Sequence, residues 1–151
     1  MESEKTLVIL KPDAVQRGLI GKILNRFEEK GLKIVAMKMI FVEKEKAHRH
    51  YEAHKKKLFF NSLISFITSG PVCIFGIEGE DAVDVIRTMV GETDPKKAQP
   101  GSIRHDFGMQ VGRNLIHASD SVESAEKEIN LFFRPEEIVE WKHNQYCWIY
   151  E

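Results

Sequence analysis

Residues 114–128 read NLIHASDSVESAEKE, and this stretch joins the end of a strand to the start of a helix. The apolar residues 115–116 form a short strand pattern that ends at His117. Asp120, with Glu123 three residues later, has the pattern of a helix N-cap and capping box. We therefore expect His117 to lie at the end of a strand, immediately before a helix.

The helix expected after Asp120 has a core-facing stripe at helical spacing, formed by Val122, Ala125, Ile129 and Phe132. Glu128 lies at the edge of this stripe and is expected to point back toward His117. A carboxylate in that place fixes the tautomer and orientation of an imidazole that is mostly neutral at neutral pH. This arrangement is typical of a nucleophilic histidine.

The string Asn-x-x-His-Ala-Ser-Asp-Ser, followed by Ser-Ala-Glu-x-Glu, resembles the active-site signature of nucleoside diphosphate kinases. Further matches run from Lys11 to the C-terminal residues 148–151, so the likeness covers essentially the whole chain. The resemblance implies an enzyme that transfers the γ-phosphoryl group of a nucleoside triphosphate, typically ATP, to a nucleoside diphosphate. It also implies a ping-pong mechanism through a phosphohistidine on His117.

The bulk composition fits a single domain over residues 1–151. The 22 basic and 23 acidic residues nearly cancel, so no global field attracts nucleic acid or a membrane. The first five residues contain no apolar signal region and no run is long enough to span a bilayer, which predicts a cytoplasmic protein. Cys73 and Cys147 are too few for a disulfide scaffold or a zinc site and are expected to be free thiols.

Hydrophobic spacing alternates between strand and helix periods along the chain. Strands are expected at residues 6–10, 32–42, 71–77 and 115–117, with 32–42 covered on much of both faces. Helices are expected at residues 20–27, 60–67 and 82–89, with a charged helix before the second of these. This order predicts an α+β, ferredoxin-like (split βαβ) fold, a four-stranded antiparallel sheet covered by helices with an inserted helical hairpin. The absence of Gly-x-Gly-x-x-Gly and Walker sequences argues against a doubly wound dinucleotide fold.

The charged segment 43–57 contains His50 and His54 at the i, i+4 spacing of a helical metal pair. A solvent-exposed, charged helix face is the simpler explanation of this segment, so we predict no metal there. Phe59 lies one residue off the apolar stripe of the next helix. Such a ring is either a satellite packing residue or a flat surface on which a base stacks.

The stretch 91–113 is rich in glycine and proline and too long for an idle connection, which predicts a long nucleotide-binding loop. Arg87 precedes it, and Thr93, Arg104 and His105 lie within it. Each arginine alone is typical of a solvated charge. Together with Lys11 near one histidine, they indicate a phosphate clamp, because guanidinium forks match phosphate oxygens. His105 has no predicted role.

The resemblance assigns roles residue by residue. The catalytic residues that it implies are His117 as nucleophile, Glu128 as its orienting acid, Ser119 as support for Glu128, and Lys11. The nucleotide-binding residues that it implies are Lys11, Tyr51, Phe59, Arg87, Thr93, Arg104, Val111 and Asn114. Mg²⁺ is expected on the nucleotide phosphates, since no acidic cluster forms a dedicated site. The chain departs from the family at Lys57, Leu58 and Ala118, where arginine, proline and glycine are common.

The C-terminal tail carries Trp141, Tyr146, Trp148 and Tyr150, and so many aromatic side chains need a surface. The tail packs either on its own domain or on a neighbouring subunit. Resemblance to eukaryotic members of the family implies a homohexamer, whereas bacterial relatives include tetramers.

Two other classes of function compete with the kinase hypothesis. A catalytically idle nucleotide or nucleic-acid binding module would use Phe59, Lys11 and the arginines as a stacking platform. It has no use for a nucleophile held by an acid, so His117 with Glu128 argues against it. A histidine phosphocarrier or protein kinase would keep the phosphohistidine and change the acceptor, which only an acceptor screen distinguishes.

Overall fold

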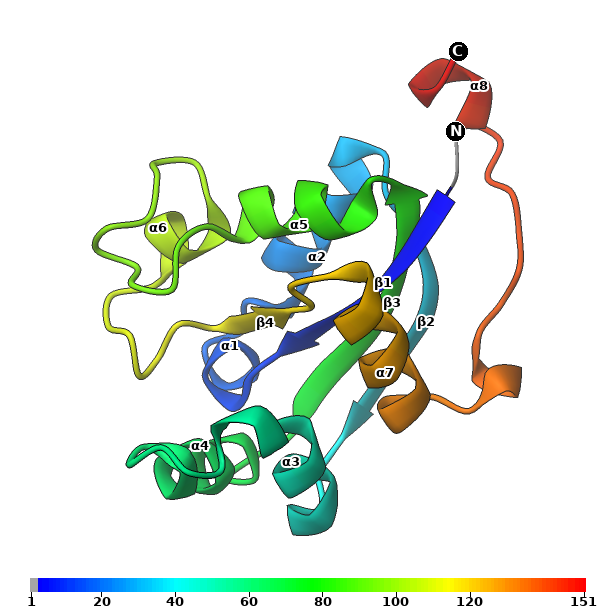
Figure 1. The fold of residues 1–151 in the computed structure, drawn as a ribbon. Helices are drawn as coiled ribbons and strands as arrows, with labels where there is room; N and C mark the ends of the chain where they lie inside the picture. The colour runs from blue at the N-terminus through cyan, green and yellow to red at the C-terminus, as the bar shows by residue number, and fades with distance from the viewer. Residues whose placement is uncertain (1–2) are drawn as a thin grey trace.

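The computed structural model describes residues 3–151 and contains a four-stranded antiparallel sheet with helices on both faces (Figure 1). The strands are β1 (Ser3–Leu10), β2 (Lys33–Ile40), β3 (Val72–Glu80) and β4 (Ile116–Ala118). Their order across the sheet is β2-β3-β1-β4. β1 and β2 are joined through helices and separated in the sheet by one other strand, and so are β3 and β4, which is the split βαβ arrangement. β2 and β3 are adjacent in the sheet. The predicted fold class is confirmed.

The helices are α1 (Pro12–Gln16), α2 (Ile20–Lys30), α3 (Lys44–His50), α4 (Phe60–Ile67), α5 (Ala82–Val90), α6 (Ile103–Phe107), α7 (Val122–Phe132) and α8 (Tyr146–Ile149), with 3₁₀ turns η1 (Glu52–His54) and η2 (Pro135–Glu137). Pro12 opens α1 at its first position, where its missing N–H is not needed. Gly31, with a φ of 101°, ends α2 in the left-handed conformation. The predicted hairpin is present as α3 and α4, which follow β2 in the chain.

The two faces of β1 belong to two separate cores. Val8 and Leu10 pack with buried side chains of α2 and α5, such as Phe27 and Ile86. Leu7 and Ile9 pack on the opposite face with α4 and α7, because successive strand side chains alternate. The central strand is therefore fixed from both sides, and it holds β4 in register beside it.

The expectation that residues 32–42 are covered on both faces is wrong. Met37 and Met39 are 63% and 56% exposed, because β2 is an edge strand whose outer part has no helix over one face. A continuous apolar run therefore marks a strand here without marking its burial.

The start of α7 also differs from the prediction. Ser121, rather than Asp120, is the N-cap, and its side-chain oxygen accepts a hydrogen bond from the Ser124 N–H at 3.0 Å. Val122 is 57% exposed instead of facing the core, because it occupies the first position of the helix. Ala125, together with Ile129 and Phe132, is buried as expected.

The long loop contains one helix that the sequence pattern did not indicate. Ser102 caps α6 by accepting a hydrogen bond from the His105 N–H. Ile103 is fully buried, and Arg26 of α2 pairs with Asp106 of α6 at 2.7 Å. A five-residue helix with so few buried side chains is too short to give a recognisable apolar period.

The C-terminal tail lies along its own chain. The Val139 N–H donates to the Val35 carbonyl at 2.8 Å, and the Trp141 indole donates to the Ile34 carbonyl at 3.0 Å. These contacts cover part of the open edge of β2, although Trp148 remains 87% exposed. Cys73 and Cys147 are free thiols, as predicted. Within residues 3–151, none of the helices has the length and apolar character needed to cross a membrane.

Candidate active site

A strained turn delivers the candidate nucleophile to its place. Leu115 is fully buried with a φ of 73°, and the Ile116 N–H donates to the Asn114 carbonyl at 2.8 Å across it. A positive φ with a hydrogen bond two residues apart defines a γ-turn that L-residues rarely adopt. The chain then enters β4, where His117 lies opposite Ile9 of β1.

The loop after β1 bonds to both backbone groups of Leu115, the central residue of this turn. The Lys11 N–H donates to the Leu115 carbonyl at 2.8 Å, and the Leu115 N–H donates to the Asp13 carboxylate at 3.0 Å. The predicted position of Lys11 at the end of the first strand is confirmed. The ends of β1 and β4 are therefore fixed relative to one another.

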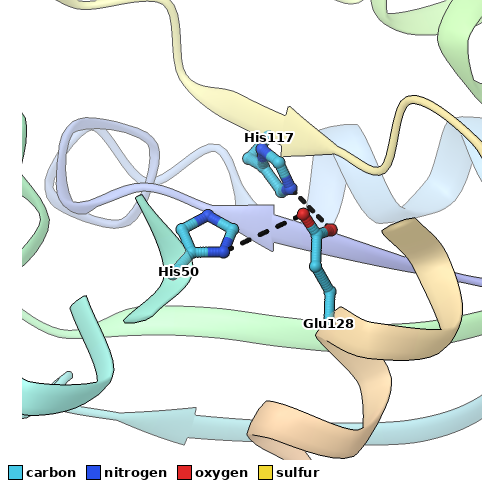
Figure 2. A group of neighbouring side chains, drawn as sticks. All are labelled: His50, His117 and Glu128. Atoms are coloured by element: carbon cyan, nitrogen blue, oxygen red, sulfur yellow. Dashed lines mark hydrogen bonds and ion pairs between the residues drawn. The ribbon is translucent and has the colours of Figure 1, made fainter. Parts of the chain in front are cut away.

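Glu128 contacts the imidazole as the helical spacing predicts (Figure 2). His117 Nε2 lies 2.8 Å from Glu128 Oε1, and the Ser119 hydroxyl donates to the same oxygen at 2.6 Å. Burial alone would raise the pKa of the Glu128 carboxyl, but the hydrogen bonds from His117 and Ser119 hold that pKa below its usual range. The ionised carboxylate can only accept, so Nε2 carries the proton and Nδ1 keeps a free lone pair.

A polar chain joins the β1 end to the long loop. Lys11 Nζ donates to the Asn114 side-chain oxygen at 2.9 Å, and the Asn114 amide donates to the Thr93 carbonyl at 3.0 Å. Burial lowers the pKa of Lys11 to about 8, helped by the charge of Arg104 and opposed by Asp13. Three predicted residues from distant parts of the sequence are thus brought together: Lys11, Thr93 and Asn114.

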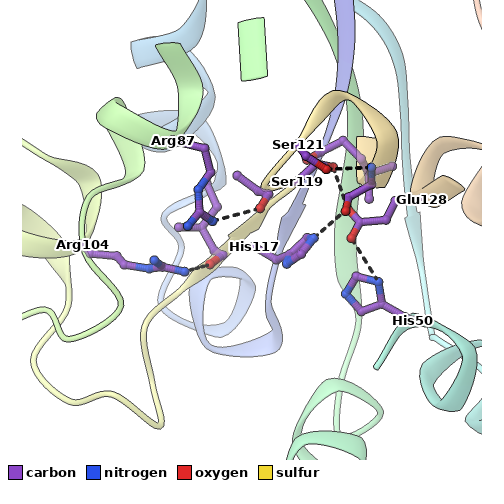
Figure 3. A network of polar contacts seen from close by, with 11 residues as sticks. His50, Arg87, Arg104, His117, Ser119, Ser121 and Glu128 are labelled. Carbon is purple, nitrogen blue, oxygen red and sulfur yellow. Dashed lines mark hydrogen bonds and ion pairs between the residues drawn. The ribbon is translucent and has the colours of Figure 1, made fainter. Parts of the chain in front are cut away.

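Both predicted arginines lie beside β4 and bond to its carbonyls (Figure 3). Arg87 donates to the Ala118 carbonyl at 3.2 Å. Arg104 is only 5% exposed and donates to the carbonyls of Asn114, Gly91 and Ile116 at 3.3, 3.1 and 2.6 Å. Burial, helped by the charge of Arg87, lowers the pKa of Arg104 to about 10. The guanidinium therefore stays charged at neutral pH, and it anchors the loop to the strand.

A cavity of about 560 Å³ opens on the other side of the imidazole, between α3 and α7. His117, Glu128 and Tyr51 line it, whereas Lys11 and the two arginines do not. Tyr51 is buried, which, with the charge of Glu128, raises its pKa to about 12. The side chain of His117 is 23% exposed, so the ring is accessible to solvent.

The side chains expected to enclose a base, Phe59 and Val111, are open to solvent. Phe59 is 48% exposed at the start of α4, and Lys57 Nζ lies 5.5 Å from the centre of its ring. Val111 is 51% exposed in the long loop. Leu58, where the family often has proline, is fully exposed beside them. The structure therefore gives Phe59 the accessibility that stacking requires, rather than a place in the core.

His50 is a site residue that sequence reasoning missed. Its side chain is only 2% exposed, its ring lies edge-on to the His117 ring with centroids 4.6 Å apart, and its Nδ1 lies 3.9 Å from Glu128 Oε2. Neither ring nitrogen has a hydrogen-bond partner among residues 3–151. Burial lowers the pKa of His50 to about 3, with His117, Lys11 and His54 also lowering it and Glu128 opposing. The imidazole is therefore neutral.

One signal in the sequence indicates this position. Ala47 on α3 and Tyr51 at its C-cap are buried and lie four residues apart, so the residue before Tyr51 is at the edge of a core-facing stripe. The surrounding charges hid that short stripe. The prediction that His50 belongs to a wet face is wrong.

Comparison with known proteins identifies the chain. The family model described as nucleoside diphosphate kinase matches residues 4–138. A nucleoside diphosphate kinase of Pyrococcus horikoshii is 60% identical over 143 residues, covering 93% of this chain and 91% of the relative. One from Archaeoglobus fulgidus is 55% identical over 148 residues, covering 98% of each chain.

Solved structures agree in fold as well as in sequence. A halophilic nucleoside diphosphate kinase from Halobacterium salinarum, in complex with CDP, superposes with a TM-score of 0.97 at 49% identity and covers 99% of this chain and all of that one. A nucleoside diphosphate kinase from Aquifex aeolicus gives a TM-score of 0.88 at 47% identity, covering 91% of this chain and all of that one. The chain therefore belongs to the nucleoside diphosphate kinase family and is a phosphotransferase of that kind.

Proposed function

We propose that this enzyme transfers the γ-phosphoryl group of a nucleoside triphosphate, typically ATP, to a nucleoside diphosphate through a phosphohistidine on His117. The observation that carries the proposal is the 2.8 Å contact between His117 Nε2 and an ionised Glu128. It leaves Nδ1 as the nitrogen with a free lone pair, on a side chain that solvent can reach.

In the first half-reaction, the Nδ1 lone pair attacks the γ-phosphorus. The new N–P bond forms as the bond to the β–γ bridging oxygen breaks, and the nucleoside diphosphate leaves with that electron pair. In the second half-reaction, a terminal phosphate oxygen of the acceptor attacks the same phosphorus and returns the electron pair to Nδ1. Glu128, supported by Ser119, holds the Nε2 proton throughout.

Charge around the transferred group comes from three side chains of the chain itself. The transition state spreads negative charge over the phosphoryl oxygens, so positioned cations supply most of the stabilisation. Lys11, Arg87 and Arg104 would contribute that charge. Arg104 uses three of its N–H groups on backbone carbonyls, so its part is to fix the loop and set the local potential as well as to contact phosphate. Thr93 would bind the same phosphates.

The nucleotide would lie between the phosphate clamp and the exposed side chains of Phe59 and Val111. Asn114 would bind a sugar hydroxyl, and Tyr51 would contact the phosphates near the nucleophile. Phe59 and Val111 would enclose the base. Stacking on Phe59 accepts any ring, so we expect low base selectivity. The CDP bound to the Halobacterium salinarum relative supports a pyrimidine nucleotide as one ligand of this site.

Mg²⁺ is proposed as the cofactor, carried by the nucleotide phosphates, whose charge it neutralises. Beside the proposed phosphate position, Lys11, Arg87 and Arg104 present cationic nitrogen, which does not ligate Mg²⁺. Asn114 offers a single amide oxygen, and this oxygen accepts a hydrogen bond from Lys11. These side chains therefore do not fit a dedicated magnesium site.

A label-and-chase experiment tests this function. Protein mixed with γ-labelled ATP should take up an acid-labile, base-stable label and release it as labelled GTP or CTP when GDP or CDP is added. The His117→Ala variant should take up none. A variant that is still labelled would show that the nucleophile is misassigned. Label that passes only to a protein acceptor would favour a phosphocarrier instead.

We further propose a homo-oligomer, with a hexamer as the expected form, a cytoplasmic location, and one domain over residues 1–151. The oligomer is supported by the exposed side chains of Met37, Met39 and Phe41 at the end of the edge strand and just after it.

A further inference from the structure

His50 carries a donor that the phosphotransfer chemistry does not use. Its imidazole is buried among the rings of Tyr51, Phe132 and His117, at centroid distances of 4.6, 5.4 and 4.6 Å. Neither nitrogen has a hydrogen-bond partner among residues 3–151. A phenylalanine would make the same ring contacts without burying two unpaired polar atoms. The polar edge therefore calls for a ligand that reaches it.

Two further donors converge on that edge (Figure 2). Among the residues that the structure describes, one donor atom each from His50, His117 and Glu128 lie within 4.8 Å of one another. The three come from α3, β4 and α7, so the fold, and not a local motif, brings them together. The i, i+4 pair of His50 with His54, which the sequence suggested, is not the one that the structure assembles.

We propose that His50, His117 and Glu128 form a binding site for a divalent transition metal ion, with Zn²⁺ as the best match, whose occupancy blocks phosphotransfer. Two imidazole nitrogens and one carboxylate oxygen are a set of three protein ligands that Zn²⁺ accepts, with a fourth position left for water. Mg²⁺ prefers oxygen donors in an octahedral arrangement and does not match this set. The site would therefore bind inhibitory Zn²⁺ in preference to Mg²⁺, the proposed cofactor of the reaction.

The cavity beside the three side chains offers a route for an ion, and binding would require their donor atoms to shift. All three residues line the cavity of about 560 Å³, through which an ion can enter and toward which the fourth position would face. Donor atoms around a tetrahedral Zn²⁺ are roughly 3.3 Å apart. The three donors now lie within 4.8 Å of one another, with His117 Nε2 only 2.8 Å from Glu128 Oε1 and His50 Nδ1 3.9 Å from Glu128 Oε2. Binding would therefore lengthen the shortest of these separations and shorten the longer ones, by up to about 1.5 Å.

The inhibition follows from the two nitrogens of His117, and it rests on the proposed function. In the metal-free enzyme, Glu128 accepts the Nε2 proton and Nδ1 is free to attack. An ion held between the three side chains takes the Nε2 lone pair, so the ring proton moves to Nδ1. That nitrogen then has no lone pair for phosphorus. Metal binding and phosphorylation of His117 are mutually exclusive.

The test titrates the full-length, nucleotide-free protein with Zn²⁺ by calorimetry. We expect one ion per chain and no displacement by excess Mg²⁺. His50→Phe should weaken binding by at least about tenfold, since even the loss of an outer partner of a metal ligand costs that much. His48→Phe is the matched control, because His48 is exposed on the same helix and outside the trio; it should bind as the wild type does. Glu128→Gln is a second variant that should also bind less tightly.

Thermal unfolding of His50→Phe checks that the variant folds, and it should be at least as stable as the wild type because the ring contacts remain. Equal Zn²⁺ affinity in His50→Phe and wild type, or no binding by the wild type, would overturn the proposal. Zn²⁺ should also stop labelling by γ-labelled ATP until a chelator is added. If Zn²⁺ binds through His50 but the metal-free protein takes up no label, the metal site stands and the proposed kinase mechanism is wrong. If the protein is labelled but binds no Zn²⁺, the kinase mechanism stands and the metal site is wrong.

Discussion

At the scale of single residues, the contact of Glu128 with His117 decides which imidazole nitrogen carries the proton and which is free to react. Glu128 Oε1 accepts from both His117 and Ser119, so Ser119 holds in place the carboxylate that fixes the proton on Nε2. The sequence predicted this contact because helical spacing alone turns Glu128 toward the strand end. It could not assign the ring nitrogen, because that depends on which edge of the imidazole the helix meets.

Removing the charge of Glu128 should slow the chemistry and spare binding. We expect Glu128→Gln to lower the rate of phosphorylation by ATP about tenfold to a hundredfold, with the Kd for ADP little changed, because the acid acts through His117. Glu126→Gln, on the exposed side of the same helix, is the control and should react at the wild-type rate. Quenched-flow labelling measures the rate, and an unchanged rate in Glu128→Gln would remove the orienting role.

The low pKa of Lys11 makes nucleotide binding sensitive to pH. Burial brings this pKa to about 8 in the free protein, so the ammonium is charged below that pH and neutral above it. A bound phosphate favours the charged form, so the affinity for ADP should fall by about tenfold for each pH unit above 8. Lys11→Arg should bind with little dependence on pH, because its guanidinium stays charged. Calorimetry at pH 7, 8 and 9 compares the two, and parallel curves would contradict the assignment.

At the scale of elements, the start of α7 decides where Glu128 points. The sequence pattern predicted Asp120 as the cap, and the structure uses Ser121, one residue later. That shift also leaves Val122 exposed. Capping pattern and periodicity locate a helix to within a residue or two, and only the docked helix decides between neighbours.

Ser121→Ala should therefore lower the free energy of unfolding by about 1 kcal/mol, the usual cost of losing an N-cap. Asp120→Ala should have a smaller effect, since the Asp120 side chain makes no capping bond. Urea unfolding at neutral pH gives both values. A larger loss in Asp120→Ala than in Ser121→Ala would return the cap to the predicted residue.

At the scale of the whole molecule, the sequence predicted the order of the strands and helices, but it predicted only in part how they pack against one another. Alternating periods predicted the four strands and the hairpin, since each depends on residues close in sequence. Burial of His50 and exposure of Met39 depend on which elements meet across the sheet. The γ-turn at Leu115 is likewise a product of tertiary contacts, because its backbone groups bond to the loop after β1. Such features leave only a faint local pattern.

The exposed side chains at the edge strand make assembly a prediction at this scale. Met37, Met39 and Phe41 are 63%, 56% and 71% exposed, and an apolar group of this kind favours contact with another copy. Light scattering coupled to size exclusion should give a mass about six times that of the 17.4 kDa chain. A mass of four chains would replace the hexamer by a tetramer, and a monomer would reject assembly altogether.

The most direct measurement of the central claim locates the phosphorus on the imidazole. Protein labelled with ¹⁵N-histidine and phosphorylated by ATP can be examined by ¹⁵N and ³¹P NMR at alkaline pH, where phosphohistidine survives. We predict that phosphorus is bonded to Nδ1 of His117, because Glu128 holds the proton on Nε2. Phosphorus on Nε2, or on any other residue, would contradict this account.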